Sequence, residues 1–270
     1  MTTAVTIAGD LTGVRVVPDD SAARDSAAAP VLFVHGLFGG AWMFAAWQQR
    51  FAALGRPSLA INLRGHHNSR PVQDLGRVAI RDYVADALDA VRVLERPVVV
   101  GHSLGGLVAL AVAASGAVRA AVLLCAAPPR GIPIASTRLA LRQIKHARAI
   151  LGARPLAPDA AEAAALVFNR TPAAERDALL ARFVPDSGRV ARELSLLSLR
   201  VDPRRVTCPV LSVGATDDRL VVPRIARAIG RRYGATHWAL DGHAHYVIGE
   251  PGWEAVADAV AAWLDRLPAE

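Results

Sequence analysis

Cysteine and lysine are scarce in this chain of 270 residues. It contains 2 cysteines, Cys125 and Cys208, and its only lysine is Lys145, so nearly all of its basic residues are arginine. Each cysteine falls in or beside an apolar run that predicts a core strand, where a buried free thiol is the expected state. Two such thiols argue against a disulfide-stabilised secreted protein and favour a reducing compartment, so we expect a cytoplasmic location.

Membrane spans and secretory signals are also missing from the pattern. The first ten residues carry no basic residue before their apolar stretch and no long apolar core, unlike a signal peptide. The apolar stretch at residues 104–118 is too short to cross a bilayer and ends at Arg119. We therefore expect neither a signal peptide nor a membrane-spanning helix.

Patterns typical of nucleic-acid binding are absent, although the formal net charge is +7. Nucleic-acid-binding proteins gather basic residues in a stripe or patch, and none with interleaved aromatics is visible here. We expect a small-molecule partner and no nucleic acid. One basic run with helical spacing is typical of a solvated helix face, and contact with a membrane surface is the weaker interpretation of it. This run comprises Arg138, Arg142, Lys145 and Arg148.

Metal-binding patterns are missing as well. The 8 histidines include the close pairs at residues 66–67 and 243–245, but there is no cysteine pair and no His-Glu-x-x-His. Protein zinc sites usually show such spacing. We therefore expect no metal ion.

What is present is the composition of a globular protein with an α/β pattern. Apolar residues are 53% and charged residues 20%, which excludes a disordered chain. Apolar runs alternate with segments of helical period, and this alternation predicts a mostly parallel sheet with helices on both faces. Residues 19–29 are polar and predict a loop. We expect strands at 14–17, 31–34, 58–62, 97–101, 120–126, 208–214 and 236–240, and helices near 41–54, 79–95 and 104–116.

The most informative motif lies at residues 101–105, which read Gly-His-Ser-Leu-Gly and match G-x-S-x-G. An apolar, β-branched run precedes it and a small, apolar run follows it, so a strand, a tight turn and a helix meet at Ser103. This is the context of a nucleophile elbow. Glycines on both sides of the serine prevent clashes at a sharp and strained turn. The motif predicts that Ser103 is a nucleophile.

A second motif lies at residues 31–40, which read Val-Leu-Phe-Val-His-Gly-Leu-Phe-Gly-Gly. With the elbow, it makes the chain resemble the α/β-hydrolase superfamily, in particular small serine esterases and lipases of the lysophospholipase or monoacylglycerol-lipase type. The resemblance implies the α/β-hydrolase fold and an oxyanion hole made by the backbone N–H groups of Leu37 and Leu104. Each such donor contributes roughly 3 kcal/mol to transition-state stabilisation. No cofactor is implied.

The resemblance also implies an acid after the serine in the chain. The strand-like run at 208–214 is followed by Asp217 and Asp218. In the family the acid often precedes a basic or proline residue and two aliphatic residues. Asp218 fits this pattern because Arg-Leu-Val follows it, and Asp217 remains the alternative.

The third member is a histidine after the last predicted strand. His243 has the preceding glycine that the family favours. His245 has the following aromatic residue and lies at the expected distance from Glu-Pro at residues 250–251. We favour His245 and keep His243 as the alternative.

Strand signals are lacking between residues 136 and 199, where helical patterns are broken by prolines. We therefore predict a helical cap at residues 131–202, inserted after the sixth strand. The hydrolase core then comprises residues 1–130 and 203–270. In the family, caps cover the active site and select the substrate, and such lids exclude water.

Two further stretches carry no predicted chemistry. Residues 64–69 read Arg-Gly-His-His-Asn-Ser and resemble the family's R-G-H-G-x-S stretch, which we interpret as structural. Residues 185–189 predict a turn before a helix, with Asp186 or Ser187 as its N-cap.

The function that this pattern predicts is hydrolysis of a carboxylic ester of a small apolar substrate, through an acyl-enzyme on Ser103. A thioesterase, a lactonase or a C–C bond hydrolase would use the same parts, and so would a non-hydrolytic lyase or small-molecule binder, because a fold does not determine a substrate. We expect an apolar acyl pocket lined by Phe38, Trp42, Met43 and Tyr246.

Overall fold

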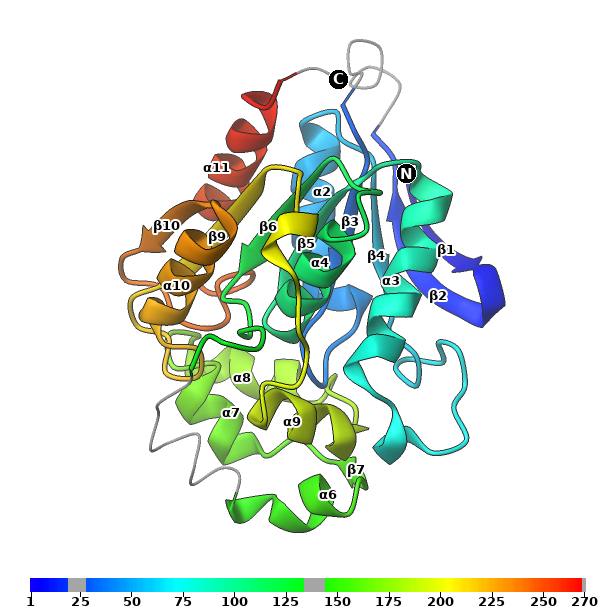
Figure 1. The fold of residues 1–270 in the computed structure, drawn as a ribbon, viewed down its shortest axis with the longest axis vertical. Coiled ribbons are helices and arrows are strands. Elements are labelled where there is room, and N and C mark those ends of the chain that lie inside the picture. The colour runs from blue at the N-terminus through cyan, green and yellow to red at the C-terminus, as the bar shows by residue number, and fades with distance from the viewer. Residues whose placement is uncertain (19–27, 134–143, 269–270) are drawn as a thin grey trace.

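The computed structural model of the protein describes residues 1–18, 28–133 and 144–268. Its centre is an eight-stranded sheet with the order β1-β2-β4-β3-β5-β6-β9-β10 (Figure 1). β1 and β2 pair antiparallel, as do β2 and β4, and the remaining pairs are parallel. The strands are β1 (Thr2–Ile7), β2 (Leu11–Val16), β3 (Val31–Val34), β4 (Ser58–Ile61), β5 (Val98–His102), β6 (Ala120–Leu124), β9 (Val210–Ala215) and β10 (Thr236–Leu240).

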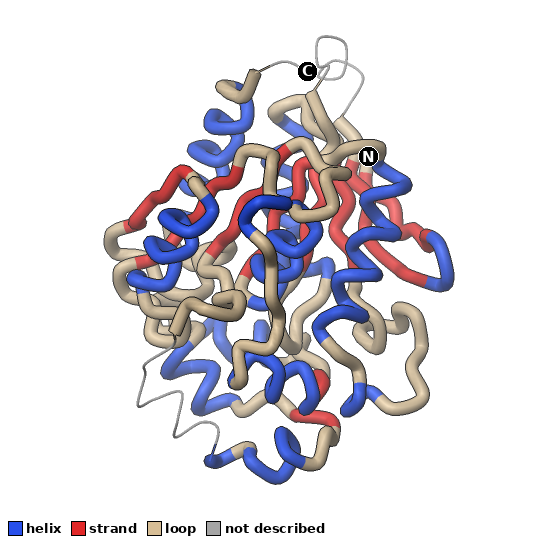
Figure 2. The backbone as a smooth tube through the Cα atoms, viewed as in Figure 1, coloured by secondary structure: helices blue, strands red, loops and turns tan. Residues whose placement is uncertain are grey.

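Both faces of the sheet are covered, because successive side chains of a strand point to opposite faces. In β3, Leu32 and Val34 join one core cluster, whereas Val31 and Phe33 join the other. The first cluster packs under α3 (Ile80–Leu94), α4 (Leu104–Ala113) and α10 (Pro223–Tyr233). The second packs under α2 (Ala45–Ala53) and α11 (Trp253–Asp265) (Figure 2). The predicted α/β class with a mostly parallel sheet is confirmed. Single 3-10 turns lie at Ala8–Asp10, Ala41–Phe44, Leu75–Arg77 and Pro203–Arg205.

The part of the chain at residues 147–195, between β6 and β9, lies apart from the sheet, below it in Figure 1. It contains two short strands, which correct the expectation that no strand occurs there. These strands are only two residues long and pair with each other, so they are too short to produce an alternating pattern. The segment comprises α6 (Ala147–Leu151), β7 (Pro155–Leu156), α7 (Ala160–Leu166), α8 (Ala173–Leu180), β8 (Asp186–Ser187) and α9 (Gly188–Ser195).

Some predictions fall on parts of the chain that the structure does not describe. The loop predicted at 19–29 lies there except for its last two residues, and so do Arg138 and Arg142 of the basic run. Of the other two members of that run, Lys145 pairs with Asp159 at 2.5 Å. None of the helices within the described residues is long and apolar enough to span a membrane. Cys125 is buried, as expected, whereas Cys208 is only partly buried.

Candidate active site

Ser103 lies at a strained turn between β5 and α4. Its backbone has φ 57° and ψ −118°, a region that costs a non-glycine residue about 1–3 kcal/mol. Hydrogen bonds hold the turn in place: the Ser103 N–H donates to the Leu124 carbonyl at 3.0 Å, and the Ser103 carbonyl accepts the N–H groups of Gly106 and Ala127. The surrounding structure therefore maintains the strain and presents the side chain at the end of the strand.

The two glycines of the motif make this turn sterically feasible. A Cβ atom on Gly101 would lie 2.0 Å from the Gly105 carbonyl oxygen, and one on Gly105 would lie 2.1 Å from the Val34 carbonyl oxygen. Both contacts are with backbone atoms of central elements, which cannot move aside. Helix α4 therefore approaches both β5 and β3 this closely only because neither position carries a side chain.

His245 contacts both Ser103 and Asp218. Its Nε2 atom lies 3.0 Å from Ser103 Oγ, and its Nδ1 atom lies 2.8 Å from Asp218 Oδ2. The other oxygen of Asp218 accepts the backbone N–H groups of Leu220 and Val221, each at 2.8 Å. The two contacts of the His245 ring favour the tautomer in which Nδ1–H donates to the Asp218 carboxylate and Nε2 accepts the Ser103 hydroxyl. The arrangement is the one in which a histidine activates a serine as a nucleophile.

The alternative acid and base of the sequence analysis lie elsewhere. The Asp217 carboxylate is 43% exposed and lies 3.4 Å from the guanidinium of Arg170. His243 pairs through Nδ1 with Glu250 at 3.0 Å. The structure thus brings Ser103, Asp218 and His245 together, and it leaves Asp217 and His243 outside this contact.

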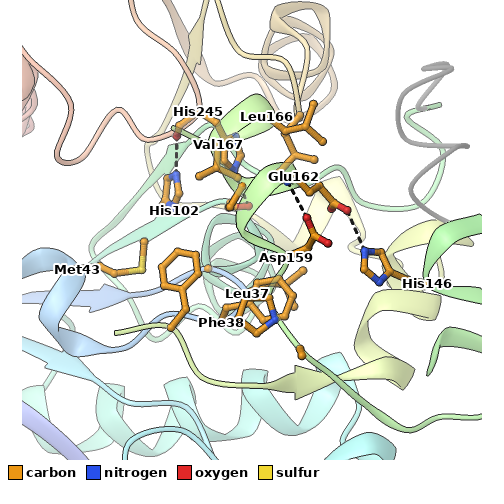
Figure 3. A pocket seen from close by; sticks show the side chains of 17 residues that line it. Leu37, Phe38, Met43, His102, His146, Asp159, Glu162, Leu166, Val167 and His245 are labelled. Atoms are coloured by element: carbon orange, nitrogen blue, oxygen red, sulfur yellow. Dashed lines mark hydrogen bonds and ion pairs between the residues drawn. The ribbon is translucent and has the colours of Figure 1, made fainter. Parts of the chain in front are cut away.

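Two cavities meet at Ser103, with volumes of about 60 Å³ and 70 Å³. Leu37, Ser103, His146 and Leu220 line both of them. The first cavity has an apolar wall and, at one end, the hydrogen-bonded pair His146 and Glu162 beside Asp159 (Figure 3). The second is almost entirely apolar, with walls formed by Pro128, Ile150, Leu156, Ala191, Leu194 and Ile225.

Two of the predicted pocket residues line the first cavity, namely Phe38 and Met43. The other two, Trp42 and Tyr246, are absent from both linings. Tyr246 is buried edge-on against Phe168, with ring centroids 5.0 Å apart, and burial raises the pKa of Tyr246 to about 12. Trp42 donates from Nε1 to His67 and lies under the guanidinium of Arg182. Adjacency in sequence therefore misidentified both as pocket residues.

The backbone N–H groups of Leu37 and Leu104 are available to a ligand. Leu104 is the first residue of α4, where an N–H has no acceptor within the helix and the helix dipole favours negative charge. Leu37 follows β3 and lines both cavities beside Ser103. Within the described residues, neither N–H group takes part in a hydrogen bond. Their role as oxyanion-hole donors stays a prediction.

Sequence reasoning missed two residues that surround His245. His102 donates from Nε2 to the His245 carbonyl oxygen at 2.7 Å, and burial together with the nearby charge of His245 lowers the pKa of His102 to about 3. Cys125 lies against Asp218, and the ligand atoms of Cys125, Asp218 and His245 are within 4.8 Å of one another. Burial and the Asp218 charge raise the pKa of the Cys125 thiol well above its ordinary value, so the sulfur carries its proton beside Asp218.

Known proteins share this architecture. The model of the Alpha/beta hydrolase family matches residues 31–259. A solved monoacylglycerol lipase from Paleococcus ferrophilus is 19% identical, with a TM-score of 0.70 over 94% of this chain and 98% of that one. An esterase from Thermogutta terrifontis is 18% identical, with a TM-score of 0.69 over 98% of both chains. An enol-lactonase from Burkholderia xenovorans LB400 is 20% identical, with a TM-score of 0.69 over 98% of this chain and all of that one (100%).

At these identities the solved structures establish the fold alone. The match to the family model establishes more than the fold, because it spans most of the chain. It runs from β3 through much of α11 and includes the elbow and the residues that contact it. The chain belongs to the alpha/beta hydrolase family.

Proposed function

We propose that the protein hydrolyses carboxylic esters of small, largely apolar substrates, through an acyl-enzyme on Ser103. The observation that carries the proposal is the position of the serine. Its hydroxyl lies 3.0 Å from His245 Nε2, at the junction of two largely apolar cavities. A nucleophile in this position reaches a carbonyl carbon whose two substituents extend in different directions.

The first step forms the acyl-enzyme. Ser103 Oγ attacks the carbonyl carbon while His245 Nε2 takes the hydroxyl proton. Asp218 holds the imidazole in the required tautomer and stabilises the imidazolium that forms. The backbone N–H groups of Leu220 and Val221, which donate to the other oxygen of Asp218, keep this carboxylate oriented toward His245.

Negative charge develops on the former carbonyl oxygen during this attack. The N–H groups of Leu37 and Leu104 stabilise that charge, since they require no rearrangement at the moment of reaction. Collapse of the tetrahedral intermediate breaks the ester C–O bond, and His245 returns its proton to the departing alcohol. Water then attacks the acyl-enzyme by the same route and releases the carboxylic acid and free Ser103.

The two cavities suggest how the substrate divides between them. The second cavity is almost entirely apolar, which suits an acyl chain. His146 lines both cavities, whereas Asp159 and Glu162 line only the first and can hydrogen-bond a polar group on the alcohol. Residues 131–202 act as the cap in this proposal, because α7 supplies part of the wall of the first cavity, and α6 and α9 supply part of the wall of the second.

Hydrolysis of a p-nitrophenyl ester series, from acetate to palmitate, tests the proposal on the parent and on Ser103→Ala. We expect turnover that depends on Ser103, with a maximum at an intermediate chain length. Each buried CH₂ adds about 0.8 kcal/mol of favourable transfer until the cavity is full. A fluorophosphonate probe should label the parent at Ser103 and leave Ser103→Ala unlabelled.

The outcomes separate the competing functions. Labelling without ester turnover would contradict an esterase and favour a thioester, lactone or C–C bond substrate. Absence of both labelling and turnover would contradict a nucleophilic role for Ser103 and favour a binding function. The similarity to a lipase, an esterase and a lactonase supports hydrolysis without selecting among these bonds.

A further inference from the structure

Asp186 brings together two stretches of the chain that have no predicted chemistry, residues 64–69 and residues 185–189. It lies in β8, within the segment between β6 and β9, and its side chain is completely buried. Its Oδ2 atom accepts the backbone N–H of Phe38 at 3.0 Å and lies 3.1 Å from His66 Nε2. Its Oδ1 atom accepts the Tyr83 hydroxyl at 2.7 Å and the Ser187 N–H at 2.6 Å.

Phe38 is held in an unfavourable backbone conformation by these contacts. Its φ is 66°, which is an outlier for a bulky residue. The Phe38 N–H donates to Asp186, and the Phe38 carbonyl accepts the Val184 N–H at 3.0 Å. Residues 184–186 therefore bind the backbone of Phe38 on both sides, and the conformation persists because its surroundings determine it.

This arrangement is adjacent to the proposed oxyanion hole. The N–H of Phe38 belongs to the planar peptide unit that begins at the Leu37 carbonyl. Fixing this unit restricts ψ of Leu37, and with it the direction of the Leu37 N–H. Leu37 and Phe38 both line the first cavity (Figure 3), together with Ser103. A change in the backbone of Phe38 would consequently turn the Leu37 N–H away from the carbonyl oxygen of a substrate.

The carboxylate of Asp186 is ionised despite its burial. His66 Nδ1 lies 3.0 Å from the Arg64 carbonyl oxygen and Nε2 faces Asp186, so both ring nitrogens have acceptors and carry protons. Burial lowers the pKa of His66, but the charge of Asp186 and the hydrogen bonds outweigh it and raise that pKa overall. Burial raises the pKa of Asp186, and His66, Tyr83 and Phe38 together lower it to about 2.

The neighbouring His35 is neutral in this arrangement. Its ring centroid is 5.1 Å from that of His66, and burial, followed by the charge of His66, lowers the pKa of His35 to about 3. It donates from Nδ1 to the Gly36 carbonyl and accepts the Leu63 N–H at Nε2. The single positive charge on His66 thus balances Asp186, and a charged carboxylate makes a stronger hydrogen bond to Phe38 than a neutral acceptor.

We propose that Asp186 is a positioning residue for the oxyanion hole: it holds Phe38 so that the Leu37 N–H is directed at the carbonyl oxygen of the substrate. The inference rests on the proposed function, because it requires the Leu37 N–H to bind that oxygen. It also assigns the segment between β6 and β9 a part in transition-state stabilisation, in addition to forming cavity walls.

Asp186→Asn tests the proposal, because it keeps the size of the side chain and removes its charge. We expect kcat on the best p-nitrophenyl ester to fall about 10- to 100-fold, with KM changed less than threefold. Affinity for a transition-state analogue, an alkyl trifluoromethyl ketone, should fall in proportion to kcat/KM. Affinity for the product carboxylic acid, a ground-state ligand, should remain unchanged.

Ser187→Ala is the matched control. Ser187 is the next residue and equally buried, but its hydroxyl contacts the Gly76 and Val78 carbonyls and caps α9. It should lower the melting temperature without a specific loss of affinity for the ketone. Equal loss of ketone and product affinity in Asp186→Asn, or a kcat within twofold of the parent, would overturn the proposal.

Tyr83→Phe provides a second variant in case Asp186→Asn does not fold. It removes one donor to Asp186 and leaves the bond to Phe38. We therefore expect kcat to fall about threefold, and the affinity for the trifluoromethyl ketone to fall by the same factor. An unchanged kcat in a folded Tyr83→Phe would then overturn the proposal. If the parent shows Ser103-dependent turnover and these variants do not behave as stated, the inference alone fails. If the parent shows no such turnover, the proposed function fails and the inference falls with it.

Discussion

The imidazole of His102 donates from Nε2 to the backbone carbonyl of His245 over 2.7 Å. The residue at the variable position of G-x-S-x-G therefore holds the backbone of the histidine that contacts Ser103. The bond requires a proton on Nε2 of the His102 ring. Burial, followed by the nearby His245, lowers the pKa of His102, so the ring stays neutral. Ser103 and His245 are thus connected by their side chains and also through the residue that precedes the serine.

This connection predicts a graded response to substitution. His102→Leu removes the donor and leaves the His245 carbonyl without it, so we expect kcat to fall about 10-fold, the equivalent of about 1.4 kcal/mol. His102→Gln can still donate to this carbonyl and should retain most of the activity. Steady-state kinetics on the best ester measure both variants. A His102→Leu variant as active as the parent would show that the bond does not matter.

Substitution of the two neighbouring aspartates distinguishes their roles. Asp218→Asn removes the charged acceptor of His245 Nδ1 and favours the wrong tautomer, so we expect kcat to fall roughly 10³- to 10⁴-fold. Asp217→Asn changes an exposed side chain near Arg170 and should leave kcat within threefold of the parent. The reverse ranking of the two variants would assign the acid to Asp217. The pair His245→Gln and His243→Gln tests the base in the same way.

The glycines of the elbow predict a large difference in stability between two identical substitutions. Gly101→Ala places a Cβ atom 2.0 Å from the Gly105 carbonyl oxygen, and we expect it to cost about 3 kcal/mol of unfolding free energy. Gly116→Ala is the control, because a Cβ atom there has nothing within 4 Å and meets only a positive φ of 75°. It should cost about 1 kcal/mol. Denaturant unfolding measures both, and equal losses would contradict the close approach.

The buried neutral histidines predict loss of stability in mild acid. Burial, with weaker contributions from neighbouring charges, lowers the pKa values of His35 and His102 from 6.5 to about 3. Their contribution to stability is therefore fully present above pH 6.5 and is lost as the pH falls from 6.5 toward 3, because only the unfolded chain takes up these protons. Each contributes about 1.4 kcal/mol per pH unit to the slope in this range.

Comparison of the parent with His102→Gln isolates the contribution of the His102 proton to this slope. Glu250, whose pKa burial raises, acts in the opposite direction near its titration, so the total slope of the parent mixes several groups. The free energy of unfolding of His102→Gln, measured between pH 6.5 and 4.5, should fall less steeply than that of the parent by about one proton. Parallel curves for the two proteins would mean that His102 is protonated in the folded state.

Substitutions that fill one cavity at a time test which cavity holds the acyl chain. Ala191 lines only the second cavity and Ala163 only the first. Ala191→Phe should shift the optimum of the ester series to shorter acyl chains, because it occupies the volume that longer chains need. Ala163→Phe should leave that optimum in place and reduce the rate for bulky alcohols. The opposite pattern would exchange the roles of the cavities.

The sequence by itself determined the parts of the protein that depend on local physics. A run such as residues 97–100 has one favourable environment, a strand buried on both faces, and glycines at 101 and 105 leave a sharp turn as the natural continuation. The motif therefore indicated Ser103 directly. The same reasoning located the central strands to within a few residues, and the family resemblance gave the prediction that Leu37 and Leu104 are the oxyanion donors.

Only the tertiary structure decided matters that depend on contacts between distant segments. Asp217 and Asp218 are adjacent in one turn. The backbone conformation of that turn decides which of the two carboxylates reaches His245. Trp42 lies in the same turn as Met43 but does not line either cavity, and its ring contacts Arg182 from a distant part of the chain. The role of Asp186 depends on a hydrogen bond to Phe38 across 148 positions of the sequence, and no local pattern records such a bond because both partners are ordinary residues until the chain folds.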